Sequence, residues 1–564
     1  MPMRHHIGQD PSGKPADKPA DKPAESGRKS AALRPDSAAG RRRTPCWGRG
    51  GAFALSLLAT ACSGGSARYA GELYSLDNFY GGIVADEPRA ALVGRQVLAA
   101  GGNAVDALVA AYFVMSATMP STAGLGGGGV CVVHRGEDDK IADEVLDFLP
   151  RAAAGGLVAV PGSARGMAAL QAKFGKLPWA QLVAPAESIA QVGEAASRAL
   201  ARDVALGEKK LRADPQMAAL FTRADGGMLG EGDNLRQSEL AGVLGQLRAK
   251  GPAELYGGLV GQQLVAGAQA LGAPLTIEDL RNFQVQVYAP LEIKWGDQLV
   301  LLPKPTGTGG AAAGISVAQM LVALDRFGGG NRAAFLAEAS RRLVADRAQW
   351  LQPGGDVSQP VESLISADHV GQVMQGAPSG GAVPENPFSA GIVAADAEGL
   401  GVACNFTMNA LFGAGRIAPG TGIILAPAPD ERGFGFSALA PMIMANRNNG
   451  EFYFASAASG GIAGALAEAE LLHAVTEEGV SLEAAMLRPR VFHGGDPDVA
   501  LYDVSGDEDP SGALTAAGFQ VEQRNAIGRI NAIFCPGGSP TDPESCQLRN
   551  DYRGNGLASF VTAD

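Results

Sequence analysis

Residues 387–409 read Pro-Phe-Ser-Ala-Gly-Ile-Val-Ala-Ala-Asp-Ala-Glu-Gly-Leu-Gly-Val-Ala-Cys-Asn-Phe-Thr-Met-Asn. Two apolar runs in this stretch flank Asp396 and Gly399, residues typical of a tight turn, so the stretch predicts a β-hairpin. Ser389 opens the first strand, while Thr407 and Asn409 lie two residues apart near the end of the second and share a face. Antiparallel pairing brings that face back toward Ser389, so we expect two hydroxyls and an amide to converge there.

The hairpin resembles the start of the small subunit in the γ-glutamyltranspeptidase family, whose pattern is Thr-Thr-His-x-Ser-Val-Val-Asp-x-x-Gly-Asn-x-Val-x-x-Thr-x-Thr-x-Asn. Aligning the aspartate, the glycine, the last threonine and the final asparagine places Ser389 on the first threonine, the self-cleavage site and nucleophile of that family. Ala390 and Gly391 depart from the pattern. Residues 374–387 are rich in Gly, Pro, Ser and Asn, which predicts the exposed loop that a cleavage site needs. The resemblance therefore implies self-cleavage between Phe388 and Ser389.

The same resemblance implies an amide hydrolase or acyltransferase that uses neither a cofactor nor a metal ion. After cleavage, Ser389 has a hydroxyl and a free α-amine, whose reference pKa of about 7.7 to 8.0 lets it act as the general base. The other site residues implied by the family pattern are Thr407, which orients the nucleophile, Asn409 and Ser437, which hold substrate, and Gly460 and Gly461, whose backbone NH groups stabilise the oxyanion.

Further segments that resemble the family extend over most of residues 80–564. They include 101–107, 120–129, 160–162, 175–179, 255–257, 278–280 and 345–347. Segments such as 335–350 have apolar residues every three or four positions, typical of amphipathic helices, and lie between glycine-marked strands. Glycine makes up 78 of 564 residues and aromatic residues only 6%, which indicates close-packed sheets. The resemblance implies a mixed α/β (α+β) fold, a four-layer αββα sandwich of the N-terminal nucleophile hydrolase type, and this alternation fits it.

The first 62 residues differ in composition from the rest of the chain. Residues 1–45 contain Lys-Pro-Ala-Asp repeats and almost no large apolar side chains, which predicts disorder. Residues 46–62 read as a signal peptide that ends in Ala-Thr-Ala-Cys at Cys62, which resembles a bacterial lipobox. We therefore expect an exported lipoprotein on the periplasmic side of a bacterial membrane, attached to it only through Cys62. A large region, 63–388, and a small region, 389–564, would stay together as a heterodimer.

The residues expected to recognise the acyl donor depart from the family pattern. The family grips the donor α-carboxylate with an arginine in Asp-Phe-Arg-Glu, and Leu149 stands at that position here. Arg151, two residues further, could reach the same face of an extended strand. Glu431 lies where an aspartate usually pairs with the donor ammonium, and Ala428 replaces a polar side chain. We predict poor turnover of glutathione-like γ-glutamyl donors, which leaves small-molecule amides with a different acyl group as substrates.

Other classes of function have weaker support in the sequence. Two glycine patterns, 124–129 and 307–312, resemble a dinucleotide fingerprint, but the first follows a predicted helix instead of a strand and prolines crowd the second. The six histidines lack metal-ligand spacing, and Gly-x-Ser-x-Gly, Walker and Cys-x-x-Cys motifs are absent. A formal net charge of −12 does not favour nucleic acid as a partner. An uncleaved, non-catalytic lipoprotein that binds a ligand or partner remains the alternative, given the departures above and at Ala438.

The six cysteines form three groups by position. The first two belong to the leader. Cys131 and Cys404 lie in apolar, strand-like runs, so we predict buried thiols at both positions. Cys535 and Cys546 are separated by Pro, Gly and Ser residues that allow a compact loop, and export would expose them to an oxidising compartment. We therefore predict a disulfide between Cys535 and Cys546.

Overall fold

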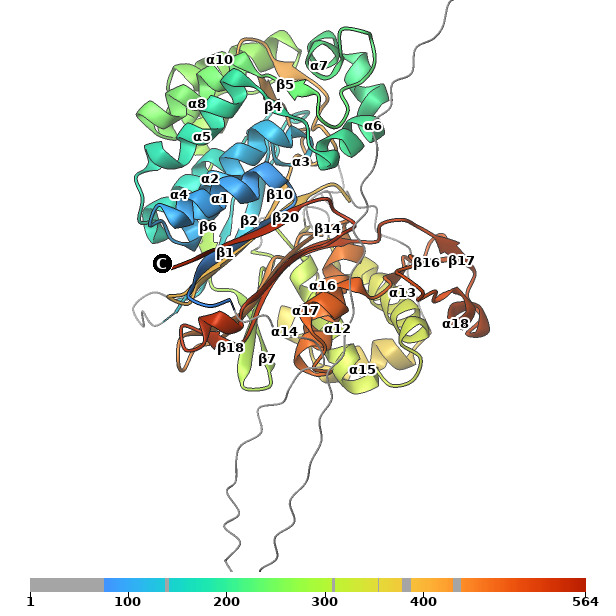
Figure 1. Cartoon of the computed structure of the whole chain (residues 1–564). Coiled ribbons are helices and arrows are strands. Elements are labelled where there is room, and N and C mark those ends of the chain that lie inside the picture. The colour runs from blue at the N-terminus through green and yellow to red at the C-terminus, as the bar shows by residue number, and fades with distance from the viewer. Residues whose placement is uncertain are drawn as a thin grey trace, which may run out of the picture. The chain divides into compact units, whose positions relative to one another are not determined.

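The structure is a computed structural model that describes residues 76–136, 142–306, 310–352, 355–377, 387–429 and 438–563. The chain divides into two compact units, residues 1–66 and 67–564, and every described residue belongs to the second. The predicted disordered extension and signal peptide lie outside the described residues. The second unit contains two large β-sheets with helices on their outer faces (Figure 1).

The first large sheet has the predicted hairpin at its centre. In the described residues its strand order is β20 (Leu557–Thr562), β1 (Phe79–Ala85), β9 (Ala390–Asp396), β10 (Leu400–Thr407), β2 (Gly128–Arg135), β3 (Glu144–Asp147) and β6 (Gln286–Tyr288). All neighbouring strands are antiparallel. The hairpin prediction is confirmed, since β9 pairs with β10 and Gly399 has φ +83° in the turn, in the left-handed region that favours glycine.

The second large sheet packs against the inner face of the first. Its order within the described ranges is β19 (Gln547–Asn550), β18 (Arg529–Ser539), β14 (Glu451–Ser459), β13 (Met442–Asn446), β8 (Gln298–Leu302) and β7 (Leu291–Trp295), again antiparallel. Val393 and Ala403 from the first sheet share one buried apolar cluster with Ile443, Ala455 and Ile533 from the second. Along each strand, the side chains that point into this inner layer alternate with side chains that face the helices.

Helices cover the outer face of each sheet. Those that bury apolar side chains against the first sheet include α1 (Pro88–Ala99), α2 (Ala104–Thr118), α4 (Ser163–Phe174), α5 (Trp179–Val192), α8 (Ser238–Lys250) and α10 (Leu259–Ala270). Those on the second sheet include α12 (Ala313–Phe327), α13 (Arg332–Trp350), α16 (Ile462–Thr476) and α17 (Leu482–Leu487). Figure 1 shows these two groups of helices on opposite sides of the paired sheets. The predicted αββα sandwich is confirmed.

Further helices and strands complete the described part of the second unit. The helices are α3 (Pro120–Ala123), α6 (Arg198–Ala213), α7 (Pro215–Phe221), α9 (Ala253–Tyr256), α11 (Ile277–Asn282), α14 (Val361–Leu364), α15 (Ala367–Gln375), α18 (Ser511–Ala516) and the 3-10 turn η2 (Pro543–Ser545). The strands are β4 (Glu194–Ala195) with β5 (Asn234–Leu235), β11 (Ile417–Ala418) with β12 (Ile423–Ile424), and β15 (Val491–His493), β16 (Ala500–Tyr502) and β17 (Val521–Gln523). The first glycine pattern, 124–129, begins directly after α3 and runs into β2, so a helix precedes it as the sequence predicted.

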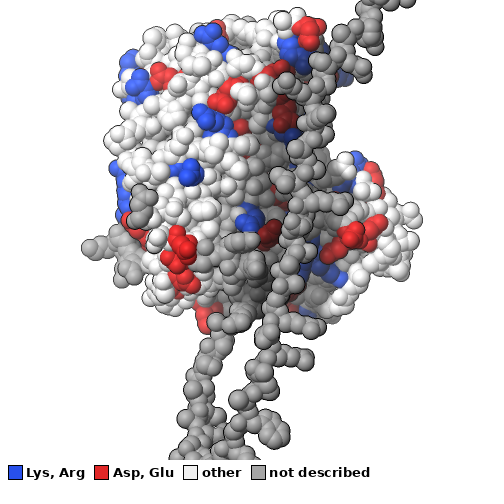
Figure 2. Space-filling model, viewed as in Figure 1, with Lys and Arg blue, Asp and Glu red and all other residues white. Residues whose placement is uncertain are grey.

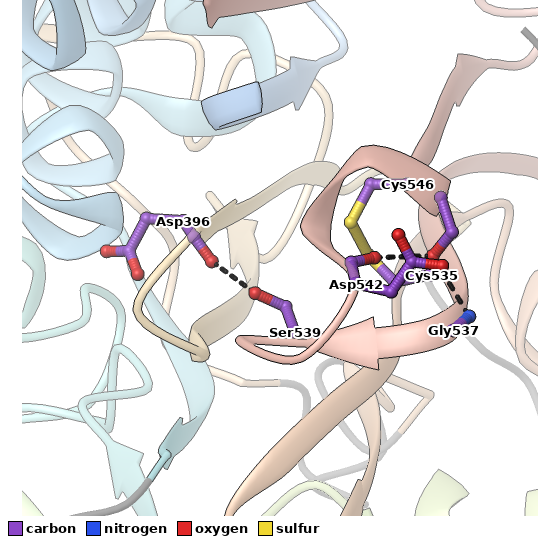
Figure 3. Close-up of a disulfide and its surroundings, with 7 residues drawn as sticks. Asp396, Cys535, Gly537, Ser539, Asp542 and Cys546 are labelled. Carbon is purple, nitrogen blue, oxygen red and sulfur yellow. Dashed lines mark hydrogen bonds between the residues drawn. A yellow bond between two sulfur atoms is a disulfide. The ribbon is translucent and has the colours of Figure 1, made fainter. Parts of the chain in front are cut away.

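Four cysteines form two disulfides, one of them predicted. The bond between Cys535 and Cys546 closes a compact loop and is confirmed (Figure 3). The prediction of two free thiols at Cys131 and Cys404 is wrong, because these residues are bonded to each other. Both are fully buried, as predicted, but they lie directly opposite each other on β2 and β10. The two cysteines are 273 residues apart in the sequence, so local sequence patterns could not predict their pairing.

Charged side chains of both signs are interspersed on the face of the molecule that Figure 2 shows. Ion pairs such as Lys176 with Glu398 and Arg447 with Glu292 join neighbouring opposite charges, and exposed pairs of this kind add little stability. Within the described ranges, every helix is too short or too polar to cross a lipid bilayer.

Candidate active site

Ser389 lies immediately before β9, at the open end of the hairpin, and only 2% of its surface is exposed. Further along β9, Val393 and Ala395 pack into the layer between the two sheets. Because side chains alternate across a strand, the same alternation directs Gly391 and Ser389 into that layer. The candidate nucleophile therefore lies between the sheets, on the side away from the outer helices.

Thr407 ends β10, and the register of the hairpin places it opposite Ser389. Its Oγ1 donates a hydrogen bond to the carbonyl oxygen of Phe388 at 3.4 Å and accepts one from the backbone N–H of Asn409 at 3.0 Å. The accepted bond leaves the hydroxyl proton free to point at the carbonyl. That carbonyl belongs to the peptide bond between Phe388 and Ser389, so Thr407 contacts the bond predicted to break.

Gly460 and Gly461 connect the end of β14 to the start of α16. Their φ angles are +112° and +68°, in the region that favours glycine. The N–H of Gly460 donates to the carbonyl oxygen of Pro387 at 3.1 Å. A Cβ added to Gly460 would lie 2.9 Å from the Cα of Gly528, so this close backbone approach also needs glycine. The turn thus directs a backbone donor at the chain just ahead of Ser389, close to the positive end of the α16 dipole.

A buried clamp, formed by Asp86 and Asn531, holds the backbone of Gly391 and was not predicted from the sequence. The N–H of Gly391 donates to Asp86 Oδ2 at 2.9 Å, and Asn531 Nδ2 donates to the Gly391 carbonyl at 2.9 Å and to Asp86 Oδ1 at 3.0 Å. Burial raises the pKa of the Asp86 carboxyl, while the charge of Arg529 opposes that shift. The clamp fixes the first residues of β9 and thereby the position of Ser389.

Two more side chains connect neighbouring strands to the glycine turn. Asn405, fully buried on β10, reaches across to β14, where its Nδ2 donates to the carbonyl of Ala458 at 2.8 Å. Arg529 on β18 donates through Nε to Ser459 Oγ at 2.8 Å. Ala458 and Ser459 directly precede Gly460, so both contacts restrain the turn that carries the backbone donor.

Asn409 has its side-chain nitrogen engaged and its side-chain oxygen available. Nδ2 donates to the carbonyl oxygens of Pro150 and Pro427, each at 3.0 Å. Oδ1 is buried and has no hydrogen-bond partner in the described part of the chain. An amide held in this way presents only an acceptor, which suits an N–H or ammonium group of a substrate.

The region expected to bind a donor carboxylate is organised differently from the family pattern. Leu149 is fully buried in the apolar layer between the sheets. Arg151 forms an ion pair with Asp147, with Nη2 to Oδ1 at 3.0 Å. Burial raises the pKa of the Asp147 carboxyl, and Arg151 opposes that shift. Arg151 therefore already neutralises a carboxyl of its own chain, and its role in donor binding remains a prediction.

Two predicted substrate residues, Glu431 and Ser437, lie outside the described residues. The same holds for most of the predicted cleavage loop, 378–386, and for part of the second glycine pattern, 307–309. In the described ranges, no group of three or more His, Cys, Asp and Glu side chains is arranged to hold a metal ion.

Two antiparallel sheets packed face to face between helices form the αββα sandwich of the N-terminal nucleophile hydrolases. The Gamma-glutamyltranspeptidase family model matches residues 90–561. The chain belongs to this family, and it is an enzyme of the γ-glutamyltransferase-like hydrolase class.

Three known proteins illustrate the similarity. The chain is 29% identical to "Acylase ACY 1 proenzyme" of Pseudomonas sp. (strain V22), over 82% of this chain and 91% of the relative. It is 25% identical to "Glutathione hydrolase proenzyme" of Escherichia coli (strain K12), over 80% of this chain and 88% of the relative. The structure of a cephalosporin acylase from Bacillus halodurans matches with a TM-score of 0.73 at 21% identity, over 88% of this chain and 98% of that one, which supports the fold.

Proposed function

We propose that this protein cleaves itself between Phe388 and Ser389 and then uses Ser389 as the nucleophile of an amidohydrolase or acyltransferase. The observation that carries the proposal is the hydrogen bond from Thr407 to the Phe388 carbonyl, directly beside Ser389. A hydroxyl donor at a carbonyl oxygen favours attack on that carbonyl, because negative charge develops on the oxygen in the transition state.

In the self-cleavage step, Ser389 Oγ attacks the carbonyl carbon of Phe388 and the peptide C–N bond breaks. An ester links Phe388 to the serine hydroxyl, and the nitrogen of Ser389 becomes a free amine. Water then hydrolyses the ester, so the net reaction consumes one water and leaves a carboxylate on Phe388. Departure of the new C-terminus takes the Pro387 carbonyl away from the N–H of Gly460.

In the mature enzyme, that freed N–H of Gly460 becomes available for the oxyanion of a substrate. The α-amine of Ser389 accepts the proton of its own hydroxyl as Oγ attacks the acyl donor, and the acyl-enzyme then passes its acyl group to water or to an amine. The clamp on Gly391 and the bond from Asn405 to Ala458 hold the nucleophile and the glycine turn in fixed positions. Such preorganisation of donors supplies much of the rate enhancement in acyl transfer.

For the substrate, we propose an acyl group other than γ-glutamyl. The apolar Leu149 is fully buried in the layer between the sheets, and Arg151 is paired with Asp147. Similar proteins include both an acylase and a glutathione hydrolase, so both kinds of donor belong in the test. Asn409 Oδ1 is the proposed acceptor for an N–H group of the donor.

We further propose export and attachment to the membrane through a lipid on Cys62, on the basis of the leader sequence. Two disulfides in the described residues support an oxidising compartment. Metabolic labelling with a fatty-acid analogue tests this proposal, since the label should enter the wild type and be absent from a Cys62→Ala variant.

Self-cleavage is tested by intact-mass measurement under reducing conditions and by N-terminal sequencing. The wild type should give two fragments, one of which begins at Ser389, and Ser389→Ala should give a single uncleaved chain. A single chain in the wild type would contradict the proposal and favour the non-catalytic alternative.

The acyl preference is tested by steady-state kinetics with γ-glutamyl-p-nitroanilide against a panel of other acyl anilides. Leu149→Arg is a poor companion variant, because it would bury an unpaired charge between the sheets. The double variant Asp147→Asn, Arg151→Gln removes both charges of the ion pair, so neither is left buried and unpaired, and it should raise KM only for donors whose carboxylate Arg151 binds. Efficient γ-glutamyl turnover by the wild type would contradict the preference without affecting the proposal of self-cleavage.

A further inference from the structure

The proposed cleavage site divides strands that are interleaved in the first large sheet. Strands β1, β2, β3 and β6 precede Ser389, while β9, β10 and β20 follow it. In the sheet, β9 pairs with β1 and β10 pairs with β2. Cleavage therefore leaves two fragments whose strands remain hydrogen bonded to each other at the centre of the sheet.

One of these shared strand pairs contains a covalent bond. Cys131 on β2 and Cys404 on β10 face each other in register, with their Cα atoms 4.1 Å apart and their sulfurs bonded. Both side chains are 0% exposed and belong to the apolar cluster beneath the outer helices. Cys131 precedes Ser389 and Cys404 follows it, so the disulfide crosses the proposed division of the chain.

We infer that the Cys131–Cys404 disulfide joins the two fragments after self-cleavage, so that the mature enzyme is one covalently linked, two-fragment molecule. The inference rests on the proposed self-cleavage. The other disulfide provides an internal contrast, because Cys535 and Cys546 both follow Ser389 and link only positions within the small fragment (Figure 3).

Disulfide formation and self-cleavage are separate reactions, and each balances in atoms and electrons by itself. Formation of the disulfide removes two protons and two electrons from the thiols, and a disulfide-bearing oxidant accepts them by thiol–disulfide exchange and becomes two thiols. Self-cleavage breaks the peptide bond before Ser389 and consumes one water, without breaking a sulfur–sulfur bond. The mature molecule is therefore one water heavier than its precursor, and its two parts separate only when a reductant supplies two electrons.

The position of the bond determines when a reductant can act. A thiolate must reach one of the sulfurs, and both lie under α-helices in the folded protein. The disulfide should therefore resist reduction in the native state and become reducible on unfolding. The tether also keeps refolding intramolecular, whereas two separate fragments must find each other at a rate that depends on concentration.

Denaturing electrophoresis with and without reductant, after free thiols are blocked with an alkylating agent, tests the inference on the purified wild type. We expect two bands in the reduced lane and one full-length band in the unreduced lane. Two bands in both lanes would overturn the tether and leave self-cleavage standing. A full-length band in both lanes would overturn self-cleavage, and the tether between fragments with it.

Matched variants show which of the two disulfides holds the fragments together in the unreduced lane. The double variant Cys131→Ala, Cys404→Ala should give two bands in both lanes, whereas Cys535→Ala, Cys546→Ala should behave like the wild type. If the first variant fails to fold, peptide mapping of the unreduced wild type serves instead. It should contain a linked peptide from the two sides of the cleavage site, and recovery of Cys131 and Cys404 as alkylated thiols would overturn the inference.

Refolding gives a second readout. After denaturation without reductant, the cleaved wild type should refold with a yield that stays constant over about a hundredfold dilution, as expected for an intramolecular process. The same protein, refolded in the presence of a reductant, should lose yield on dilution. A wild-type yield that falls in parallel with the reduced sample would contradict a covalent link between the fragments.

Discussion

The two ends of the β9–β10 hairpin fit the same family pattern and have different surroundings. At the turn end, the carboxylate of Asp396 accepts hydrogen bonds from three backbone N–H groups, including that of Ala104 at the start of α2 at 3.0 Å. At the open end, Ser389 and Thr407 meet the glycine turn that precedes α16. The turn end anchors the hairpin to a helix, while the open end places the proposed reactive groups between the sheets.

Residues that match the same family pattern can therefore have different roles: those at the turn end hold the hairpin in place, and those at the open end are proposed to take part in the reaction. A substitution at the open end should change the rates of cleavage or turnover by more than its effect on stability explains. A substitution at the turn end should change stability and leave the turnover of folded molecules nearly unchanged. The following variants separate the two effects, beginning with the largest.

Gly460→Ala should have the largest effect, because it displaces the backbone donor that faces the open end. The new Cβ would lie 2.9 Å from the Cα of Gly528, and φ is +112°. Loss of one oxyanion donor typically lowers kcat by on the order of 10²–10³. Steady-state kinetics with the best anilide donor measures this loss.

Gly518→Ala is the matched control for the backbone strain alone. Gly518 has φ +91°, and a Cβ there would meet no atom within 4 Å. Its stability cost should therefore be smaller than that of Gly460→Ala, which adds the close approach to Gly528, and kcat should be unchanged. Equal kinetic losses in the two variants would show that strain, and not the position of the donor, explains the effect.

Thr407→Val should slow self-cleavage by roughly ten- to hundredfold. The variant keeps the shape of the side chain and loses the donor to the Phe388 carbonyl, and a hydrogen bond to a developing charge contributes about 1.5 to 3 kcal/mol. The fraction of cleaved chain as a function of time after refolding measures the rate. Thr407→Ser keeps the hydroxyl and should cleave at nearly the wild-type rate, so a slow Ser variant would speak against this role.

The hairpin and its open end could be predicted because their signals are local. Alternation of apolar residues and the turn residues set the register, and the register brings Thr407 to Ser389. The Asp86–Asn531 contact could not be predicted, since it joins residues 445 positions apart and depends on the order of strands in two sheets. The cross-strand disulfide was missed for the same reason.

The pairing of Arg151 was missed for a different physical reason. The sequence suggested which face of a strand the side chain could occupy, but the choice of partner depends on burial. Asp147 is 0% exposed, and a buried carboxylate is costly without a cation beside it. Such a requirement becomes visible only when the surroundings of both residues are known.

Asp396→Asn tests the turn end through its dependence on pH. Burial raises the pKa of the Asp396 carboxyl from 3.8 to about 6, against the opposing effect of its backbone hydrogen bonds. The folded chain thus holds this proton more tightly than the unfolded chain. The stability that the group contributes is fully present below pH 3.8 and is lost as the pH rises through about 6.

The expected result is a pH-dependent difference between wild type and variant in the free energy of unfolding. The wild type should lose roughly 2 to 3 kcal/mol relative to Asp396→Asn between about pH 4 and pH 7. Denaturant titrations across this range measure it. Glu398→Gln, at an exposed residue of the same turn, removes a charge that adds to the raised pKa of Asp396, so it should reduce the pH dependence slightly. A constant difference for Asp396→Asn would refute the assignment.

Ser539→Ala should have the smallest effect, about 1 kcal/mol in the free energy of unfolding. The fully buried Ser539 Oγ donates to the carbonyl oxygen of Asp396 at 2.9 Å, as Figure 3 shows. That carbonyl also accepts the N–H of Gly399, so it keeps one partner in the variant and the cost should lie at the low end of the range for a buried hydrogen bond.

Ser545→Ala is the natural control, because Ser545 also forms hydrogen bonds in the disulfide-closed loop but near solvent, where water can replace the lost hydroxyl. It should cost less than Ser539→Ala. Neither variant should alter kcat or the rate of self-cleavage, since Ser539 contacts the end of the hairpin remote from Ser389. A loss of turnover in Ser539→Ala at unchanged stability would show that the two ends are coupled through β9, and the separation between anchor and reactive end would then fail.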